Sequence, residues 1–201
     1  MNIYAESNFV LELALMQEEQ DSCEGILQLC ESGDSQLVLP AFSLAEPYDT
    51  LTRRDKDRKQ LAQRVEAELR QLGRSKPYKT ETDLHRTMAA LLVRSGEEET
   101  QRLFQVRDRL LKIAEIIPLD KAILISAAQI QSTQKLSAPD AIVLASTMQH
   151  LTITNSTQSC FLNKNSYDFD DPDIEDMLAA RNCKMILSFA QGLNYIQNQP
   201  R

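Results

Sequence analysis

Four acidic residues lie at positions where the side chains of an α/β chain can meet. Glu6 directly follows a short apolar run at residues 1–5, and Asp168 follows a second apolar run at residues 160–162. Glu46 and Asp140 each lie near the start of a predicted helix. Functional sites of parallel sheets lie at the carboxyl ends of the strands. We therefore expect the four carboxylates to converge at one edge of the sheet.

These residue types predict a particular chemistry. Carboxylates that share a low-dielectric site repel one another, and a divalent cation removes that cost. Magnesium takes one or two carboxylates and completes its shell with waters and substrate phosphate oxygens. A bound ion activates water and neutralises charge that develops on a phosphoryl group. Since the chain has two His residues and no C-x-x-C pair, we expect metal-dependent phosphodiester hydrolysis and no zinc site.

Asp140 is the single charge in an apolar stretch. Ser137 is expected to be the N-cap of a buried helix, and Pro139 suits the first turn. Residues 141–148 are apolar almost all round, which is typical of a helix covered on most sides. Asp140 is then either an acid favoured by the helix dipole or a metal ligand. The other acids favour the second interpretation.

The predicted elements alternate between strands and helices. Strands are expected at residues 1–5, 36–39, 160–162 and 183–187, with helical patterns between them. This order predicts an α/β fold, a doubly wound and mostly parallel sheet of four to five strands. Residues 52–117 carry helical apolar stripes and no convincing strand, so we expect a helical insertion within a single domain of residues 1–201.

Composition excludes several classes of protein. The chain has 201 residues, 42% of them hydrophobic and 25% charged, which is typical of one globular domain. Its net charge of −7 disfavours a protein that coats nucleic acid, but allows an enzyme with a local basic strip. No apolar run has the length of a membrane span and no signal peptide is recognisable. We expect a cytoplasmic protein with no membrane partner, whose four Cys residues are core thiols.

Residues 52–79 form a basic segment in this acidic chain. The segment holds ten Lys or Arg and four acids, so it carries +6 and the remaining residues carry −13. It can bind RNA phosphates, or it can be a solvated helix face with local ion pairs. Arg53 and Arg54 lie nearest the predicted Glu46 helix, and they are the RNA-binding candidates.

Four sequence blocks resemble the motifs of the PIN-domain family, and they occur in the family's order. They are Tyr-Ala-Glu-Ser-Asn-Phe-Val-Leu at residues 4–11, Val-Leu-Pro-Ala-Phe-Ser-Leu-Ala-Glu at 38–46, Ser-Ala-Pro-Asp-Ala-Ile-Val-Leu-Ala at 137–145, and Phe-Leu-Asn-Lys-Asn-Ser-Tyr-Asp-Phe at 161–169. The resemblance implies a PIN-like fold and a Mg²⁺- or Mn²⁺-dependent endoribonuclease. VapC-like toxins are the commonest bacterial type, so it also implies RNA as substrate and an antitoxin or other protein partner. Homodimerisation is compatible with the apolar helices.

The resemblance also assigns roles to the acids. Glu6, Glu46 and Asp140 take the family's first three acidic positions, and Asp168 completes the catalytic set. The metal ligands would be Glu6, Asp140 and Asp168, with Asn165 as an alternative occupant of the fourth position. Ser7 and Asn8 join Arg53 and Arg54 as substrate-binding candidates.

Two positions depart from the family pattern. The first acid is normally Asp, and Glu6 is longer by one methylene, about one bond length, whereas metal sites tolerate only small displacements. Asn165 supplies a neutral oxygen in place of a charge. The alternative function is therefore a PIN-like module that binds RNA or a protein partner without cutting. A phosphotransfer domain is disfavoured because the chain lacks paired acids after its first strand and a glycine-rich phosphate loop.

Local roles compete with site roles at three residues. Ser43-Leu-Ala-Glu46 has the pattern of a capping box, in which Glu46 would bind the helix N-terminus. Glu6 follows its strand directly, so we expect it to make no cap and Asn8 to be the N-cap. Ser7 either binds a ligand carboxylate or metal-bound water, or belongs to the turn.

Overall fold

The computed structural model describes residues 1–164, 169 and 171–199, with the backbone alone at residues 80, 81 and 83–86. Its centre is a sheet of five parallel strands in the order β3-β2-β1-β4-β5. The strands are β1 (Asn2–Ala5), β2 (Gln36–Pro40), β3 (Glu115–Ile117), β4 (Ser159–Leu162) and β5 (Cys183–Ile186). The predicted parallel α/β sheet is confirmed.

Strand register aligns the carboxyl ends of the strands at one edge of the sheet. Tyr4 of β1 pairs with Val38 on one side and Phe161 on the other, and Ala5 pairs with Leu162. The central strands are buried on both faces, as expected for a parallel sheet covered by helices. Residues that directly follow β1 and β4 are therefore neighbours in space.

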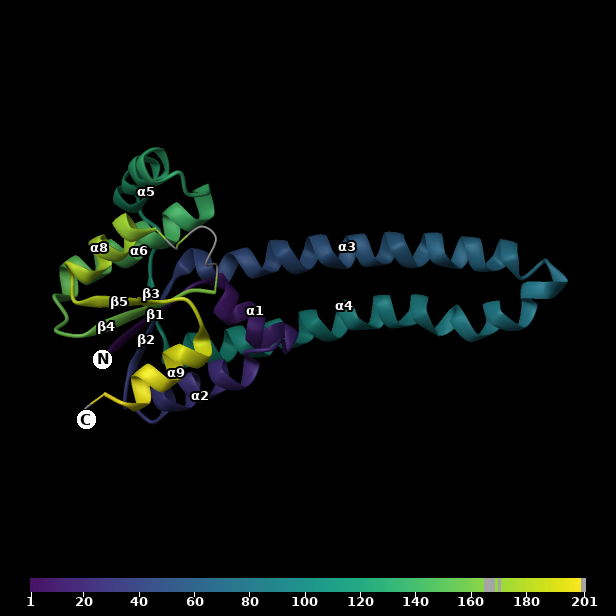
Figure 1. Cartoon of the computed structure of the whole chain (residues 1–201), viewed down its shortest axis with the longest axis horizontal. Helices are drawn as coiled ribbons and strands as arrows, with labels where there is room; N and C mark the ends of the chain where they lie inside the picture. The colour runs from purple at the N-terminus through teal and green to yellow at the C-terminus, as the bar shows by residue number, and fades with distance from the viewer. Residues whose placement is uncertain (165–168, 170, 200–201) are drawn as a thin grey trace.

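Helices cover both faces of the sheet (Figure 1). One face packs against α1 (Ser7–Leu15), α2 (Gln20–Glu31), α9 (Phe189–Gln197) and the proximal parts of α3 (Ala41–Leu72) and α4 (Lys79–Ile113). The other face packs against α5 (Lys121–Gln134), α6 (Ala138–Thr154) and α8 (Pro172–Ala179). The sheet is thus doubly wound. All four Cys residues are buried free thiols, as predicted.

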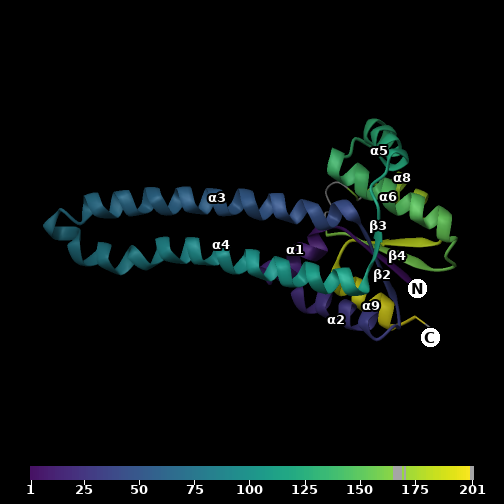
Figure 2. The same cartoon turned by 180° about the vertical axis from the view of Figure 1, so that it is seen from behind.

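Two long helices project from this α/β body as an arm. They are α3 (Ala41–Leu72) and α4 (Lys79–Ile113), joined through the short helix η1 (Lys76–Tyr78). Figures 1 and 2 show them running side by side, and their contact is the largest between any two elements that the structure describes. Since α3 begins at Ala41, directly after the end of β2 at Pro40, the first helix of the arm continues the chain from the carboxyl end of β2.

The structure corrects the prediction for residues 52–117. The helical segment begins earlier, at Ala41, and its range ends in a strand, β3, which pairs in parallel with β2 at one edge of the sheet. His150 of α6 holds this edge in place, because its ring accepts or donates hydrogen bonds at 2.8 Å to Tyr4 Oη and 3.1 Å to Glu115 Oε1. No helix in the described part of the chain is long and apolar enough to cross a membrane.

Candidate active site

Glu6 lies directly after β1, at the carboxyl edge of the sheet. It is the N-cap of α1, and its Oε2 accepts a hydrogen bond of 2.8 Å from the backbone N–H of Asn8. The expectation that Glu6 makes no cap and that Asn8 is the N-cap is therefore wrong. The side chain is only 7% exposed, and its second oxygen, Oε1, is buried without a hydrogen-bond partner among the described residues. Capping therefore accounts for one carboxylate oxygen and leaves the other unexplained.

The electrostatic environment of Glu6 includes two other acids. Burial raises the pKa of Glu6 from its ordinary value of 4.5 to about 8. Hydrogen bonds from Asn8 oppose this shift, and the negative charges of Glu46 and Asp140 raise the pKa further. The carboxylates of Glu6 after β1, Glu46 of α3 and Asp140 of α6 thus share one environment, although 134 positions separate the first from the last. A cation bound there would offset both the cost of burying the Glu6 charge and the repulsion between the three carboxylates.

Glu46 lies in the second turn of α3 and faces Ser7. Ser7 is buried, and its Oγ donates a hydrogen bond to Glu46 Oε2. The capping-box interpretation of Glu46 is wrong, because α3 begins at Ala41 after Pro40 and Ser43 already lies inside the helix. Ser7 binds a carboxylate, which is the first of the two roles considered for it.

Asp140 occupies the first turn of α6, as predicted, and Ser137 is the N-cap. Ser137 Oγ donates a hydrogen bond of 2.5 Å to Asp140 Oδ2. The helix dipole favours a negative charge at this position, and the same charge acts on Glu6. Asp140 can therefore be an acid favoured by the helix dipole and also a metal ligand, because its charge acts on the buried carboxylate of Glu6.

Two of the predicted metal ligands, Asn165 and Asp168, lie outside the described residues. Among the residues that are described, no three His, Cys, Asp or Glu side chains are placed closely enough to hold one metal ion. Arg53 and Arg54 are exposed on α3, seven and eight residues beyond Glu46, which corresponds to about 10 Å along the helix axis.

The donor chemistry nevertheless fits a hard divalent cation. Carboxylate oxygens are the ligands that Mg²⁺ and Mn²⁺ prefer. Glu6 Oε1 is a buried oxygen that no described donor satisfies, and its charge is disfavoured by two neighbouring acids. Buried polar atoms of this kind are rare in folded proteins and call for an explanation.

A comparison with protein-family models identifies the family to which this chain belongs. A family model described as "PIN domain" matches residues 3–169. The chain belongs to the PIN-domain family. Searches of the curated proteins and of the solved structures found no match. PIN domains are generally nucleases, so the chain has a nuclease-type fold, and the matched range contains all four predicted acids.

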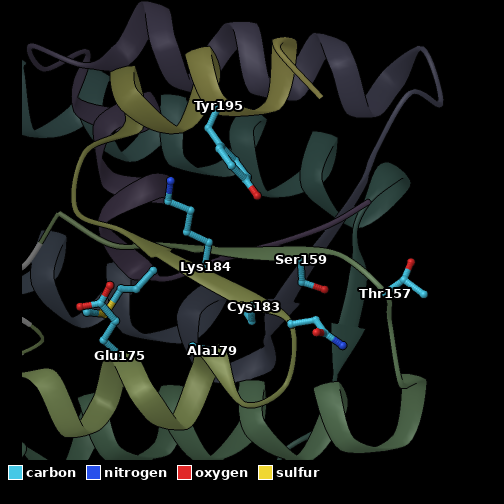
Figure 3. Close-up of a pocket in the computed structure, with 9 residues that line it drawn as sticks. Thr157, Ser159, Glu175, Ala179, Cys183, Lys184 and Tyr195 are labelled. Atoms are coloured by element: carbon cyan, nitrogen blue, oxygen red, sulfur yellow. The ribbon is translucent and has the colours of Figure 1, made fainter. Parts of the chain in front are cut away.

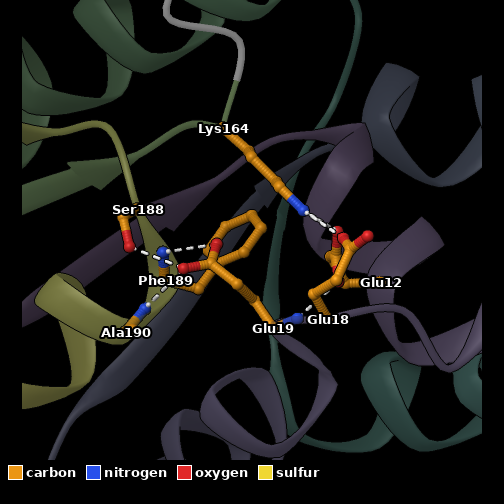
Figure 4. A network of polar contacts seen from close by, with 7 residues as sticks. All are labelled: Glu12, Glu18, Glu19, Lys164, Ser188, Phe189 and Ala190. Atoms are coloured by element: carbon orange, nitrogen blue, oxygen red, sulfur yellow. Dashed lines mark hydrogen bonds and ion pairs between the residues drawn. The ribbon is translucent and has the colours of Figure 1, made fainter.

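A polar network that the sequence analysis missed holds the PIN-domain edge together (Figure 4). Lys164, two residues after β4, reaches α1 and binds Glu12 Oε1 at 2.6 Å and Glu18 Oε2 at 3.2 Å. Glu12 is buried, and its other oxygen accepts the backbone N–H of Glu19 at 3.0 Å. The available signal was Glu12 itself, the one charge in the apolar run of residues 9–14.

Glu19 extends this network to the loop after β5. Its carboxylate accepts hydrogen bonds from Ser188 Oγ at 2.6 Å and from the backbone N–H groups of Phe189 at 3.1 Å and Ala190 at 3.3 Å, at the N-terminus of α9. Burial raises the pKa of Glu19, but these hydrogen bonds outweigh burial and leave the pKa below its ordinary value. Lys164 after β4 and the start of α9 after β5 are thereby held to α1 and to the α1–α2 connection.

A surface hollow lies away from this edge (Figure 3). Ser159, Cys183 and Lys184 line it from the amino ends of β4 and β5, and Glu175 and Tyr195 flank it from α8 and α9. Lys184 Nζ lies 4.8 Å from the centre of the Tyr195 ring. Because Ser159 pairs with Asn2 and Glu6 follows the opposite end of β1, this hollow is not part of the candidate active site.

Proposed function

We propose that this PIN domain is a metal-dependent endoribonuclease that hydrolyses phosphodiester bonds in RNA. The observation that carries the proposal is the buried Glu6 carboxylate. One of its oxygens has no hydrogen-bond partner among the described residues, and its pKa is raised by burial and by the charges of Glu46 and Asp140. Glu6 and Asp140 would hold Mg²⁺ or Mn²⁺ together with Asp168 and the neutral oxygen of Asn165. Glu46 would complete the catalytic set.

Each described acid is held by a neighbouring donor. The Asn8 N–H fixes Glu6 Oε2, Ser7 fixes Glu46, and Ser137 fixes Asp140. Preorganised donors of this kind keep ligands in a productive geometry. When bound, the metal ion would supply a polarised water and neutralise charge on the scissile phosphate.

RNA would approach this edge of the sheet through a second set of residues. In the proposal, Asn8 lines the approach at the start of α1, and Arg53 and Arg54 bind phosphates on α3. Ser7 is buried and would act on the substrate only through Glu46, which it orients. The cationic side chains of Arg53 and Arg54 would offset the repulsion between the acids and the RNA backbone.

Cleavage of an end-labelled RNA with Mg²⁺ or Mn²⁺ tests the proposal. Asp140→Asn should abolish cleavage while the far-UV CD spectrum and Tm stay near wild type. Asp176→Asn, which changes an exposed acid of α8, is the matched control and should cleave normally. Full activity of Asp140→Asn in clean preparations would show that the site is wrongly assigned, and cleavage of a DNA of the same sequence alone would refute the RNA substrate.

A specific observation favours the alternative, a PIN module that binds RNA or a protein partner without cutting. No three potential ligand side chains in the described part of the chain are close enough to share a metal ion, and the first acid is Glu rather than Asp. Titration calorimetry with Mn²⁺ separates the two functions. Millimolar Mn²⁺ that gives neither heat nor a thermal shift supports the binding module, whereas saturable binding lost in Asp140→Asn supports the nuclease.

The remaining parts of the proposal are a toxin role with an antitoxin partner, a homodimer, and a cytoplasmic location. The toxin role rests on the resemblance to VapC-like toxins, the homodimer on the apolar helices, and the location on the composition of the chain. A small open reading frame beside the gene, whose product forms a complex with this chain, would support the toxin role. Light scattering on the purified chain tests the dimer.

A further inference from the structure

The arm is an antiparallel two-helix coiled coil, and this geometry divides the surface of α3 into two faces. Its buried and half-buried residues recur alternately four and three positions apart, which is the heptad pattern. On α3 they are Leu51, Asp55, Arg58, Ala62, Val65 and Leu69. On α4 the same spacing joins Ala89, Leu92, Gly96, Glu99, Leu103, Val106 and Leu110, and further half-buried residues such as Val93 and Thr100 flank this row. The positions of α3 on the far side of this seam form its outer face.

The outer face of α3 is basic and rich in amides. It has nine positions between residues 53 and 71, and all nine side chains are exposed. Four are Lys or Arg, three are Gln, and there is a single acid. The nine are Arg53, Lys56, Asp57, Gln60, Gln63, Arg64, Ala67, Arg70 and Gln71. Beyond the end of α3, exposed Arg74, Lys76 and Lys79 add three cations at the tip of the arm.

Ion pairing within the arm leaves this outer face positively charged. Asp55 points into the seam, because a Cβ on Gly96 of α4 would come within 2.6 Å of its Oδ1. Asp55 also holds Lys59, at 2.7 Å. Arg58, an inward residue, pairs with Glu99 of α4 at 2.6 Å. On the outer face, Arg70 lies 2.9 Å from Glu66, and both side chains are largely exposed, so the pair is weak and open to competition by an anion.

The outer face also has a hollow and a defined starting point. Gln60, Gln63, Arg64 and Ala67 line a shallow depression on it, where amides offer both donors and acceptors beside a guanidinium. Arg53 lies seven residues beyond Glu46 on the same helix. From Arg53 to the end of α3 the face runs for about 30 Å, which matches about nine nucleotides of a strand with stacked bases, at ~3.4 Å each.

We propose that the outer face of α3 is a track for the phosphate backbone of RNA, which leads from the candidate active site to the tip of the arm. This inference rests on the proposed function and adds a substrate requirement to it. RNA that extends about nine nucleotides or more to one side of the cleavage position is bound along the arm, and shorter RNA contacts only the body.

Binding to a cleavage-deficient chain tests the track. Full-length Asp140→Asn is titrated with a fluorescent, unstructured 24-nucleotide RNA at several salt concentrations, and Glu6→Gln serves as a second background. The arm variant neutralises two exposed cations of the outer face and one at the tip, Lys56→Gln, Arg64→Gln and Arg74→Gln, with Gln chosen to keep helix propensity. The matched control neutralises three exposed cations elsewhere: Arg94→Gln, Lys112→Gln and Lys121→Gln.

The expected loss follows from counterion release. Each phosphate contact to single-stranded RNA contributes about 0.7 to the slope of log affinity against log salt. The arm variant should lower the slope by about 2 and the affinity on the order of 100-fold near 0.1 M salt. The control, with the same change in net charge, should leave the slope unchanged. In a series of 6, 12, 18 and 24 nucleotides, affinity should rise with length in the parent and stay nearly flat in the arm variant.

Other results overturn the inference. Equal slopes for the arm variant and its control refute the track, as does an undiminished length dependence in the arm variant. A change of oligomeric state in the arm variant with unchanged RNA binding shows that this face is a protein interface. Wild-type cleavage with no effect of the arm variant would remove the track and leave the nuclease, whereas arm-dependent binding without any cleavage would remove the nuclease and leave the track.

Discussion

Replacing Glu6 by Gln should stabilise the metal-free protein, and the gain should grow with pH. Gln keeps the shape of the side chain and a carbonyl oxygen for the Asn8 N–H, so the cap of α1 is retained. What the substitution removes is the negative charge, which is buried and repelled by Glu46 and Asp140. A substitution at a candidate active site is thus expected to increase stability.

The magnitude follows from the pKa. In the unfolded chain Glu6 titrates near 4.5, and in the folded chain near 8. Between these values the folded state holds a proton that the unfolded state has lost, so wild-type stability falls as pH rises through this window. Above pH 8 the loss levels off at an upper limit of about 5 kcal/mol, at 1.36 kcal/mol for each pH unit. The Gln variant has no such loss.

Urea unfolding in EDTA at half-unit steps from pH 5 to 9 measures the effect. The difference in unfolding free energy between Glu6→Gln and wild type should be small at pH 5 and reach several kcal/mol at pH 9. Glu97→Gln, at an exposed site on α4, is the control and should give a flat difference near zero. A flat difference for Glu6→Gln, or a variant less stable than wild type at pH 9, would refute the proposed environment of Glu6.

Three further predictions concern the neighbours of the acids. Lys164→Met should destabilise the chain by about 1–3 kcal/mol, because it leaves Glu12 buried and charged without its partner. Adding Glu12→Gln should recover much of that loss in the same urea titration, and simple additivity of the two changes would contradict the pairing. Ser7→Ala should lower Mn²⁺-dependent cleavage by about 10–100-fold with little change in Tm, because Glu46 loses the donor that orients it, and unchanged activity would remove Ser7 from the site. Saturating Mn²⁺ at 100 times its Kd should stabilise wild type by about 2.7 kcal/mol and Glu6→Gln by much less, as a thermal-shift titration can measure.

Local sequence signals predicted the sheet well where strands were apolar and followed by turn residues. The runs that became β1, β2, β4 and β5 are of this kind, and the alternation of strands with helices gave the parallel order. The strand β3 escaped prediction because Glu-Ile-Ile is three residues long and directly follows a long helix. Its strand character comes from pairing with β2 and from the Glu115–His150 contact, which are both long-range.

Capping residues show where short patterns mislead. The pattern Ser43-Leu-Ala-Glu46 fits a capping box, but the helix begins at Ala41, directly after the N-cap Pro40, so Ser43 already lies inside its first turn. Glu is an unusual N-cap, yet Glu6 takes this role because α1 begins immediately after β1. The convergence of Glu6, Glu46 and Asp140 on a shared environment could be inferred from strand ends, whereas their serine partners depend on tertiary contacts that sequence spacing does not reveal.

The position of bound Mn²⁺ in a crystal structure tests the central claim most directly. Crystals soaked in Mn²⁺ and measured at the manganese absorption edge locate the ion without reference to activity. The account predicts an anomalous peak at the carboxyl edge of the sheet, with oxygens of Glu6, Asp140 and Asp168 about 2 Å from it. Saturating Mn²⁺ with no peak at this edge, or with Glu6, Asp140 and Asp168 facing separate surfaces, would contradict it.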